Sequence, residues 1–244
     1  MRWMERMVET RIVCHRGALL NAPENTFASA NTALELGGSI IELDIRQSAD
    51  GVLYVMHDER VDRTTNGTGK ISELTSAEID LLDAGGWFDE QFKDEPVPRL
   101  QDYLSSLLGR AGFYLEIKKA DCKAVAELVR ELGNADQCFT FSFDPEMREQ
   151  MRLYAPEIKH MIQWTTAGSI ESAINEYHAQ IIEFNEHDFA EKDILDCKEA
   201  GLKVMFFTDR PDVEHLTKAL KLEMDFVNID HIEVFDRLRR NFKR

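Results

Sequence analysis

Short runs of apolar residues recur along the chain, separated by segments in which apolar positions have helical spacing. The runs are rich in isoleucine, valine, leucine and phenylalanine, which is typical of strands buried on both faces of a parallel sheet. In the segments between them, apolar residues recur every three or four positions and predict amphipathic helices. The predicted strands are Ile12–Cys14, Ile40–Gln47, Phe113–Lys118, Gln137–Phe141, Lys159–Trp164, Ala179–Glu183, Lys203–Phe207 and Phe226–Ile229.

Regular alternation of strand and helix predicts a parallel sheet with right-handed crossovers. The first helix follows Pro23, with Asn25 as the expected N-cap, and ends before Gly37. Eight strand–helix units in 244 residues favour a closed barrel over an open sheet, so we expect residues 1–244 to form a single TIM (β/α)8 barrel domain. The other predicted helices are Leu100–Leu108, Asp121–Leu132, Asp144–Leu153, Ile170–Tyr177, Phe189–Ala200 and Val213–Leu220.

The second strand returns through a hairpin, and a long irregular segment follows. Asp50-Gly51 lies between Ile40–Gln47 and the β-prone run Val52–Met56, which is a strong hairpin signal. From residue 59 to residue 98 the alternation gives way to polar turns and one short helix. A connection of this length in a compact barrel is usually functional. Residues 59–98 are therefore predicted to form a small insertion that caps the barrel after the strand-two hairpin.

Composition limits the partners of the protein. Asp and Glu number 45 against 29 Lys and Arg, which gives a formal net charge of −16. Such a surface repels nucleic acid and anionic lipid, so we expect neither as a partner, and an anionic small-molecule substrate needs cations in its site. No run approaches the ~20 apolar residues of a membrane span, and Met1–Val13 lacks the apolar region of a signal peptide. We expect a cytoplasmic protein, and the sequence does not indicate its oligomeric state.

Candidate chemistry begins with two carboxylates on the second strand. Glu42 and Asp44 are two residues apart, so a strand places both on one face. The isoleucine and leucine residues around them indicate a buried strand rather than a solvated face. Two carboxylates at this spacing repel, and a proton or a cation must lie between them. A divalent metal ion is the simplest answer.

A second alternating strand places Glu116 and Lys118 on one face. Glu116 could complete a three-carboxylate metal site with Glu42 and Asp44, and Lys118 could supply the cation that an anionic substrate needs. Oxygen ligands without a supporting cysteine favour Mg²⁺ or Ca²⁺ over structural zinc. The alternative is a plain ion pair between Glu116 and Lys118 inside the barrel.

Two histidines follow neighbouring strands. His15 comes directly after the first strand, and folding about the hairpin returns His57 to the level of Asp44. A lone histidine at a strand end is more often a satisfied polar group than a catalyst. Two imidazoles beside one metal site are nevertheless the outline of acid–base hydrolysis.

The ordered motifs resemble the glycerophosphodiester phosphodiesterase family over nearly the whole first half of the chain. In the second half the likeness is weaker, because Phe207-Thr208-Asp209-Arg210 stands where many members have Trp-Thr-x-Asn. Asn228-Ile229-Asp230 only partly matches the usual Thr-Asp ending. The matching motifs are His15-Arg16-Gly17, Pro23-Glu24-Asn25-Thr26, Glu42-Leu43-Asp44, Asp50-Gly51, Val55-Met56-His57-Asp58, Arg63-Thr64-Thr65-Asn66-Gly67-Thr68-Gly69, Pro96-Val97-Pro98-Arg99-Leu100 and Leu115-Glu116-Ile117-Lys118.

The resemblance implies a TIM barrel in which residues 59–98 cap the catalytic face. It also implies that Glu42, Asp44 and Glu116 are ligands of a divalent cation. His15 and His57 would form an acid–base pair, and Arg16 and Lys118 would hold phosphate oxygens.

The reaction implied by the resemblance is metal-dependent hydrolysis of a glycerophosphodiester to glycerol 3-phosphate and an alcohol. By family analogy His57 is the base and His15 the acid, and the attacking oxygen belongs either to water or to the 2-hydroxyl of glycerol. Two other classes share parts of the site: phospholipase D-like lipid phosphodiesterases, and a barrel that only binds a phospho-ligand. The long insertion after His57-Asp58 argues against the first, and the complete set of acidic, basic and imidazole groups argues against the second.

Overall fold

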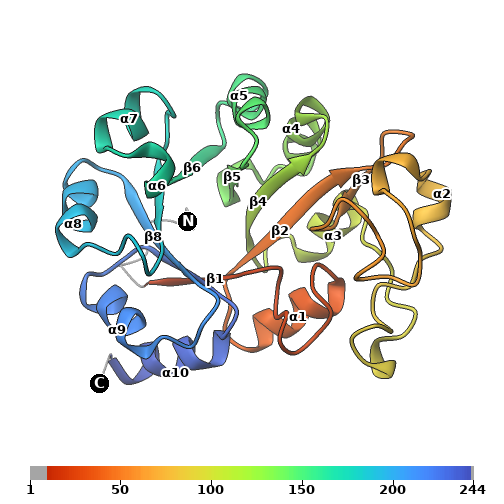
Figure 1. The fold of residues 1–244 in the computed structure, drawn as a ribbon, viewed down its shortest axis with the longest axis horizontal. Coiled ribbons are helices and arrows are strands. Elements are labelled where there is room, and N and C mark those ends of the chain that lie inside the picture. The colour runs from red at the N-terminus through yellow and green to blue at the C-terminus, as the bar shows by residue number, and fades with distance from the viewer. Residues whose placement is uncertain (1–9, 243–244) are drawn as a thin grey trace.

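The computed structural model describes residues 10–242. Most of Met1–Val13, where we expect no signal peptide, lies outside the described residues. Within this range, eight parallel strands close into a barrel surrounded by helices (Figure 1). The order is β1-β9-β8-β7-β6-β5-β4-β2, pairing of β1 with β2 closes the ring, and β3 joins β2 in antiparallel fashion. The predicted TIM barrel is confirmed. The strands are β1 (Arg11–Cys14), β2 (Ile40–Gln47), β3 (Leu53–Val55), β4 (Gly112–Lys119), β5 (Cys138–Phe141), β6 (Lys159–Gln163), β7 (Ile181–Phe184), β8 (Lys203–Thr208) and β9 (Phe226–Ile229).

Amphipathic segments between the strands form the outer layer of helices. These are α1 (Phe27–Glu35), α2 (Ser76–Ile79), α3 (Leu100–Leu107), α4 (Cys122–Glu131), α5 (Pro145–Tyr154), α6 (Trp164–Ala167), α7 (Ile170–Asn175), α8 (Glu191–Glu199), α9 (Val213–Lys221) and α10 (Ile232–Phe242), with short 3₁₀ turns at Ile71–Glu73, Glu90–Phe92 and Ala135–Gln137. The side chains of Asp121, Asp144 and Asp212 accept hydrogen bonds from backbone N–H groups in the first turns of α4, α5 and α9. Among the described residues, no helix is long and apolar enough to cross a bilayer.

Strand alternation separates apolar from acidic side chains on β2. Ile41, Leu43 and Ile45 are fully buried and belong to the main apolar core. Glu42 and Asp44 project from the opposite face, into the barrel. The strand is therefore fixed by its outer face and carries its chemistry on the inner one.

A packed aromatic layer fills the barrel interior below these carboxylates. Tyr114 stacks on Phe139 with ring centroids 4.7 Å apart, and Phe139 contacts Phe226 at 5.7 Å. Tyr114 lies two residues before Glu116 on β4 and therefore shares its face. The barrel interior is filled with packed side chains and is not a pore, as in other TIM barrels. Polar groups at the strand ends are thus directed to the carboxyl end of the barrel.

The start of α1 differs from the sequence prediction. Thr26, not Asn25, is the N-cap, and its hydroxyl accepts a hydrogen bond from the Ser29 N–H at 3.2 Å. Asn25 has a left-handed backbone (φ 59°), and its side chain donates to Asp44. Both residue types are good N-caps, and the contact with Asp44 assigns Asn25 to the site instead.

Two elements in the second half of the chain differ from the sequence prediction. Trp164 begins α6, whereas the predicted strand Lys159–Trp164 ends at that residue. Helix α10 is not among the predicted elements, although its buried Ile232 and Phe235 are three residues apart, which is a helical spacing.

Residues 59–98 lie between β3 and α3 and pack largely on themselves (Figure 1). Trp87 donates its indole N–H to the Ala84 carbonyl at 2.8 Å, and its ring contacts Phe88. Both aromatic side chains thus contact their own segment. A small apolar cluster separate from the main core contains Tyr54, Met56, Val61, Ile71, Ile79, Ala84 and Val97.

We propose that residues 59–98 form a cap within a single domain, and deletion tests this. The Val55 N–H donates to the Pro98 carbonyl at 2.9 Å, and Tyr54 pairs with Arg99, so the two sides of the segment already meet. Replacing residues 60–96 with a short Gly-Ser linker, together with Tyr54→Thr to remove the ring that the segment covers, should leave a barrel that unfolds cooperatively but has an altered substrate range. Thermal and urea unfolding followed by circular dichroism check this. Non-cooperative unfolding of the variant would show that the segment belongs to the folding core.

Candidate active site

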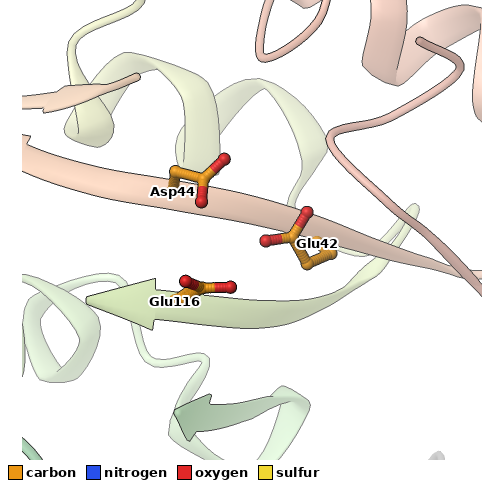
Figure 2. Close-up of side chains that lie close together, drawn as sticks. All are labelled: Glu42, Asp44 and Glu116. Atoms are coloured by element: carbon orange, nitrogen blue, oxygen red, sulfur yellow. The ribbon is translucent and has the colours of Figure 1, made fainter. Parts of the chain in front are cut away.

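Three carboxylates meet inside the barrel, on the neighbouring strands β2 and β4 (Figure 2). Asp44 and Glu116 are partners in the parallel register, and Glu42 lies two residues before Asp44 on the same face. One oxygen from each of the three side chains lies within 4.8 Å of the others. Glu42 and Asp44 are 1% exposed and Glu116 is 7% exposed. Water therefore does little to screen their repulsion.

Burial and repulsion keep the cluster from carrying three full charges. Burial, with the charges of Asp44 and Glu116, raises the pKa of Glu42 well above its usual range. Burial and the charge of Asp44 also raise the pKa of Glu116. Burial acts on Asp44 in the same direction, but the charges of Lys118 and Arg16 outweigh it and lower the Asp44 pKa. The surroundings therefore favour the ionised form of Asp44 and oppose the ionised form of Glu42 and Glu116.

Two fixed cations face the carboxylates. The Lys118 ammonium group contacts Glu116 and lies 3.1 Å from Asp44 Oδ1, so the ion pair considered from the sequence is present. The Arg16 Nε lies 3.6 Å from Asp44 Oδ2, and the Arg16 backbone N–H donates to Glu42 Oε2 at 2.6 Å. Arg16 has a left-handed backbone (φ 52°), which residues other than glycine seldom adopt. This conformation accompanies the contact between its backbone and the cluster.

Polar contacts brace the site from the loops. Asn25 Nδ2 donates to Asp44 Oδ2 at 2.7 Å. Arg63, from residues 59–98, donates to both oxygens of Glu24 at 2.8 Å and from Nε to Asp58 Oδ2 at 2.6 Å. Bidentate pairs of this kind fix orientation as well as distance. Arg63 thereby connects the segment to the loop that carries Asn25.

Each candidate histidine is held by one carboxylate. His15 Nδ1 lies 2.7 Å from Asp230 Oδ1, and His57 Nδ1 lies 2.7 Å from Asp58 Oδ1. Such a contact favours the tautomer with its proton on Nδ1, which leaves the Nε2 lone pair to face a substrate. Burial lowers the pKa of His57, although the charge of Asp44 opposes this.

Asp230 was not among the site residues predicted from the sequence, where it stood only in the partly matching motif Asn228-Ile229-Asp230. The signal was available, because a closed barrel pairs its last strand with its first. Cys14 and Ile229 are partners in the register of β1 and β9, so His15 and Asp230 are the next residues on the two strands.

The donor set suits a hard divalent cation. Glu42 Oε1 is buried and has no hydrogen-bond partner in the part of the chain that the structure describes. A buried carboxylate oxygen without a partner is costly unless a ligand satisfies it. Three carboxylates supply the oxygen atoms that Mg²⁺ and Ca²⁺ prefer, so Glu42, Asp44 and Glu116 fit such an ion.

A comparison of the sequence with protein families identifies the family of this chain. Residues 15–234 match the glycerophosphoryl diester phosphodiesterase family. The chain belongs to this family. The sequence-based identification and the prediction of a phosphoric diester hydrolase are both confirmed.

Relatives and solved structures of the same description agree with the family match. A glycerophosphodiester phosphodiesterase of Caldanaerobacter subterraneus is 33% identical over 87% of this chain and 91% of that protein. A shorter match, to a putative member from Bacillus subtilis, spans 54% of each protein. The crystal structure of a glycerophosphodiester phosphodiesterase from Agrobacterium tumefaciens is 46% identical, with a TM-score of 0.90 over 93% of this chain and 99% of that one. An Oleispira antarctica phosphodiesterase in complex with the product sn-glycerol-3-phosphate is 25% identical, with a TM-score of 0.83 over 93% and 95%.

Replacing Glu42 by glutamine tests the cation site. The folded pKa of Glu42 is raised, so the ionised form costs folding free energy above the unfolded pKa, and Glu42→Gln removes that cost. In chelator, the variant should melt at the wild-type temperature or slightly higher. In millimolar Mg²⁺ or Ca²⁺ the wild type should gain ~2.7 kcal/mol at 100 times Kd, and the variant should gain nothing.

Thermal melts of the two proteins, with and without cation, make the comparison. Glu73→Gln, at an exposed position, serves as the matched control and should keep the full cation-induced rise. An undiminished rise in Glu42→Gln would mean that Glu42 is not a ligand.

Proposed function

We propose that this enzyme hydrolyses glycerophosphodiesters to glycerol 3-phosphate and an alcohol, with a divalent cation, Mg²⁺ or Ca²⁺, held by Glu42, Asp44 and Glu116. The observation that carries the proposal is a buried three-carboxylate cluster together with two carboxylate-held histidines, one directly after β1 and one just after β3. The Oleispira antarctica structure in complex with sn-glycerol-3-phosphate supports the product.

Basic groups at the cluster suit a phosphodiester anion. When bound, the cation would supply positive charge to the phosphate oxygens and stabilise the charge that develops on them. Arg16 presents several N–H donors in a plane, an arrangement that matches phosphate oxygens. Lys118 is paired with Asp44 and Glu116; once these carboxylates hold a cation, its ammonium group is available to a phosphate oxygen.

The two histidines differ in a way that supports separate roles. The pKa of His57 is lowered by burial, which keeps the imidazole neutral and able to accept a proton from the attacking hydroxyl. Its partner Asp58 is shared with Arg63, which weakens any stabilisation of a protonated His57. We assign His57 as the base and His15, held by Asp230, as the acid that protonates the leaving alcohol. The attacking oxygen belongs either to water or to the 2-hydroxyl of glycerol.

A direct assay tests the activity. Purified protein with glycerophosphocholine should release glycerol 3-phosphate, release should stop in chelator, and excess Mg²⁺ or Ca²⁺ should restore it. The ion that restores the rate identifies the cofactor. Glu42→Gln, made in parallel, controls for contaminating phosphodiesterase. Failure of folded, cation-loaded protein to cleave any glycerophosphodiester would reject the proposal.

Alanine variants test the histidine roles. His15→Ala and His57→Ala should each lower kcat by at least ~10²-fold, the usual contribution of a positioned acid or base. Both should keep the cation-induced rise in melting temperature, and His178→Ala, at an exposed position, should keep activity. Because the pKa of His57 is lowered, kcat/KM should fall with decreasing pH only below the ordinary histidine value of ~6.5. Wild-type turnover in either variant would remove that histidine from the mechanism.

A further inference from the structure

Glu183 and Asn228 form a second polar group inside the barrel, distinct from the three-carboxylate cluster. Residues paired in register on neighbouring parallel strands project to the same face of a sheet, as do residues two apart on one strand. The register, followed from β7 round to β2, therefore places Glu183 and Asn228 on the inner face with Glu42. The register pairs are Glu183 with Met205, Met205 with Phe226, Asn228 with Val13, and Val13 with Ile40.

Both side chains carry an oxygen atom that lacks a partner. Glu183 is 6% exposed and Asn228 is 3% exposed. Gln163 Nε2 donates to Glu183 Oε1 at 3.4 Å, which is a long hydrogen bond. Within residues 10–242, Glu183 Oε2 and Asn228 Oδ1 are buried with no hydrogen-bond partner. Buried acceptors are almost always satisfied, so these two call for donors that the described chain does not provide.

The electrostatic surroundings of Glu183 differ from those of Asp44. Burial raises the pKa of Glu183 to about 7. Hydrogen bonding by the Gln163 and Asn228 side chains opposes this rise, and the charge of Glu116 adds to it. The pKa of Asp44, also buried, is lowered by Lys118 and Arg16. Asp44 is thus matched by cations of the chain, whereas the carboxyl group of Glu183 is surrounded by amides and other acids.

Asn228 belongs to the strand end that carries Asp230, the partner of the proposed acid. Asn228 and Asp230 are two residues apart at the end of β9, and Asp230 holds His15 Nδ1 at 2.7 Å. Asn228 also pairs in register with Phe207, whose ring contacts that of His15 with centroids 5.3 Å apart. The unpaired oxygen of Asn228 is therefore on the His15 side of the site, which is the leaving-group side if His15 is the acid. Glu183 lies beside Asn228, whose side chain acts on it as a hydrogen-bonding group.

We propose that Glu183 and Asn228 bind the leaving alcohol and favour one that carries hydrogen-bond donors, either an ammonium group or free hydroxyl groups. The proposal rests on the proposed function, because His15 marks the leaving-group side only as the acid. A carboxylate and an amide carbonyl accept from N–H and O–H groups, and a quaternary ammonium group has neither to offer. Glu183 is then a specificity-determining residue.

Three substrates with the same glycerol phosphate and different alcohols test this. Glycerophosphoethanolamine carries an ammonium group, glycerophosphoglycerol carries hydroxyl groups, and glycerophosphocholine carries no donor on its alcohol. The wild type should have a higher kcat/KM for at least one of the first two than for the third. Glu183→Gln should reduce that preference by about 10-fold, mainly through KM, as expected when a hydrogen bond to a charged group is removed from substrate binding. A loss confined to glycerophosphoethanolamine identifies the ammonium group as the donor, and a loss confined to glycerophosphoglycerol identifies the hydroxyl groups.

Two controls keep the test decisive. Glu183→Gln preserves side-chain volume and removes an unmatched buried acid, so it should fold and keep the cation-induced rise in melting temperature. Glu171→Gln, on the exposed side of α7, should leave the preference unchanged. An unaltered preference in Glu183→Gln, or an equal fall for all three substrates, would overturn the assignment of Glu183. Failure of the wild type on all three would overturn the proposed function, and this inference with it.

Discussion

Like charges held together in a rigid barrel are the constraint on which the site depends. Glu42 and Asp44 stand on β2 and Glu116 on β4, and the hydrogen-bonded register of these strands prevents the three from moving apart. The apolar outer face of β2, including Ile41 and Leu43, is packed in the core that keeps the strand in place. Folding free energy from that core therefore holds together groups that would otherwise separate. A site of this kind binds a cation far better when folded than when unfolded, which links the cofactor to stability.

The cations at the cluster and in the loops around it come from separate parts of the chain. Arg16 follows β1, Lys118 belongs to β4, and Arg63 comes from residues 59–98. Arg63 binds both Glu24 and Asp58, so the orientation of the candidate base depends on a segment outside the barrel repeat. The Arg63 guanidinium group thus connects residues 59–98 to the proposed base, so a change in the segment can affect the site without any residue of the cluster being altered.

Local patterns were sufficient to predict the barrel and the meeting of Glu42, Asp44 and Glu116. Alternation along β2 places Glu42 and Asp44 on one face whatever the rest of the fold does, and the Asp-Gly turn returns His57 to their level. Contacts set by closure of the ring could not be read this way. Asp230 is 215 residues from His15 in sequence, and its partner follows only from the pairing of the last strand with the first.

Helix-capping and strand propensities did not reveal the roles of Asn25 and Glu183. Asn25 and Thr26 are both good N-cap residues. Thr26 is the N-cap in the structure, and Asn25 contacts Asp44 instead. Glu183 looked like the end of an ordinary strand. Its position became informative only once the register showed that it shares the barrel interior with Asn228.

The acidic surface of the protein would repel an anionic substrate, and cations close to the cluster can offset this repulsion. The net charge of −16 is spread over the whole chain, and salt screens exposed charges beyond ~8 Å at physiological ionic strength. Arg16 and Lys118 are partly buried at the cluster, where attraction is screened much less. Under the proposed function, short-range cations would therefore recognise the phosphate despite the repulsive surface. By the same reasoning, an unmatched acid such as Glu183 belongs with the end of the substrate that carries no phosphate.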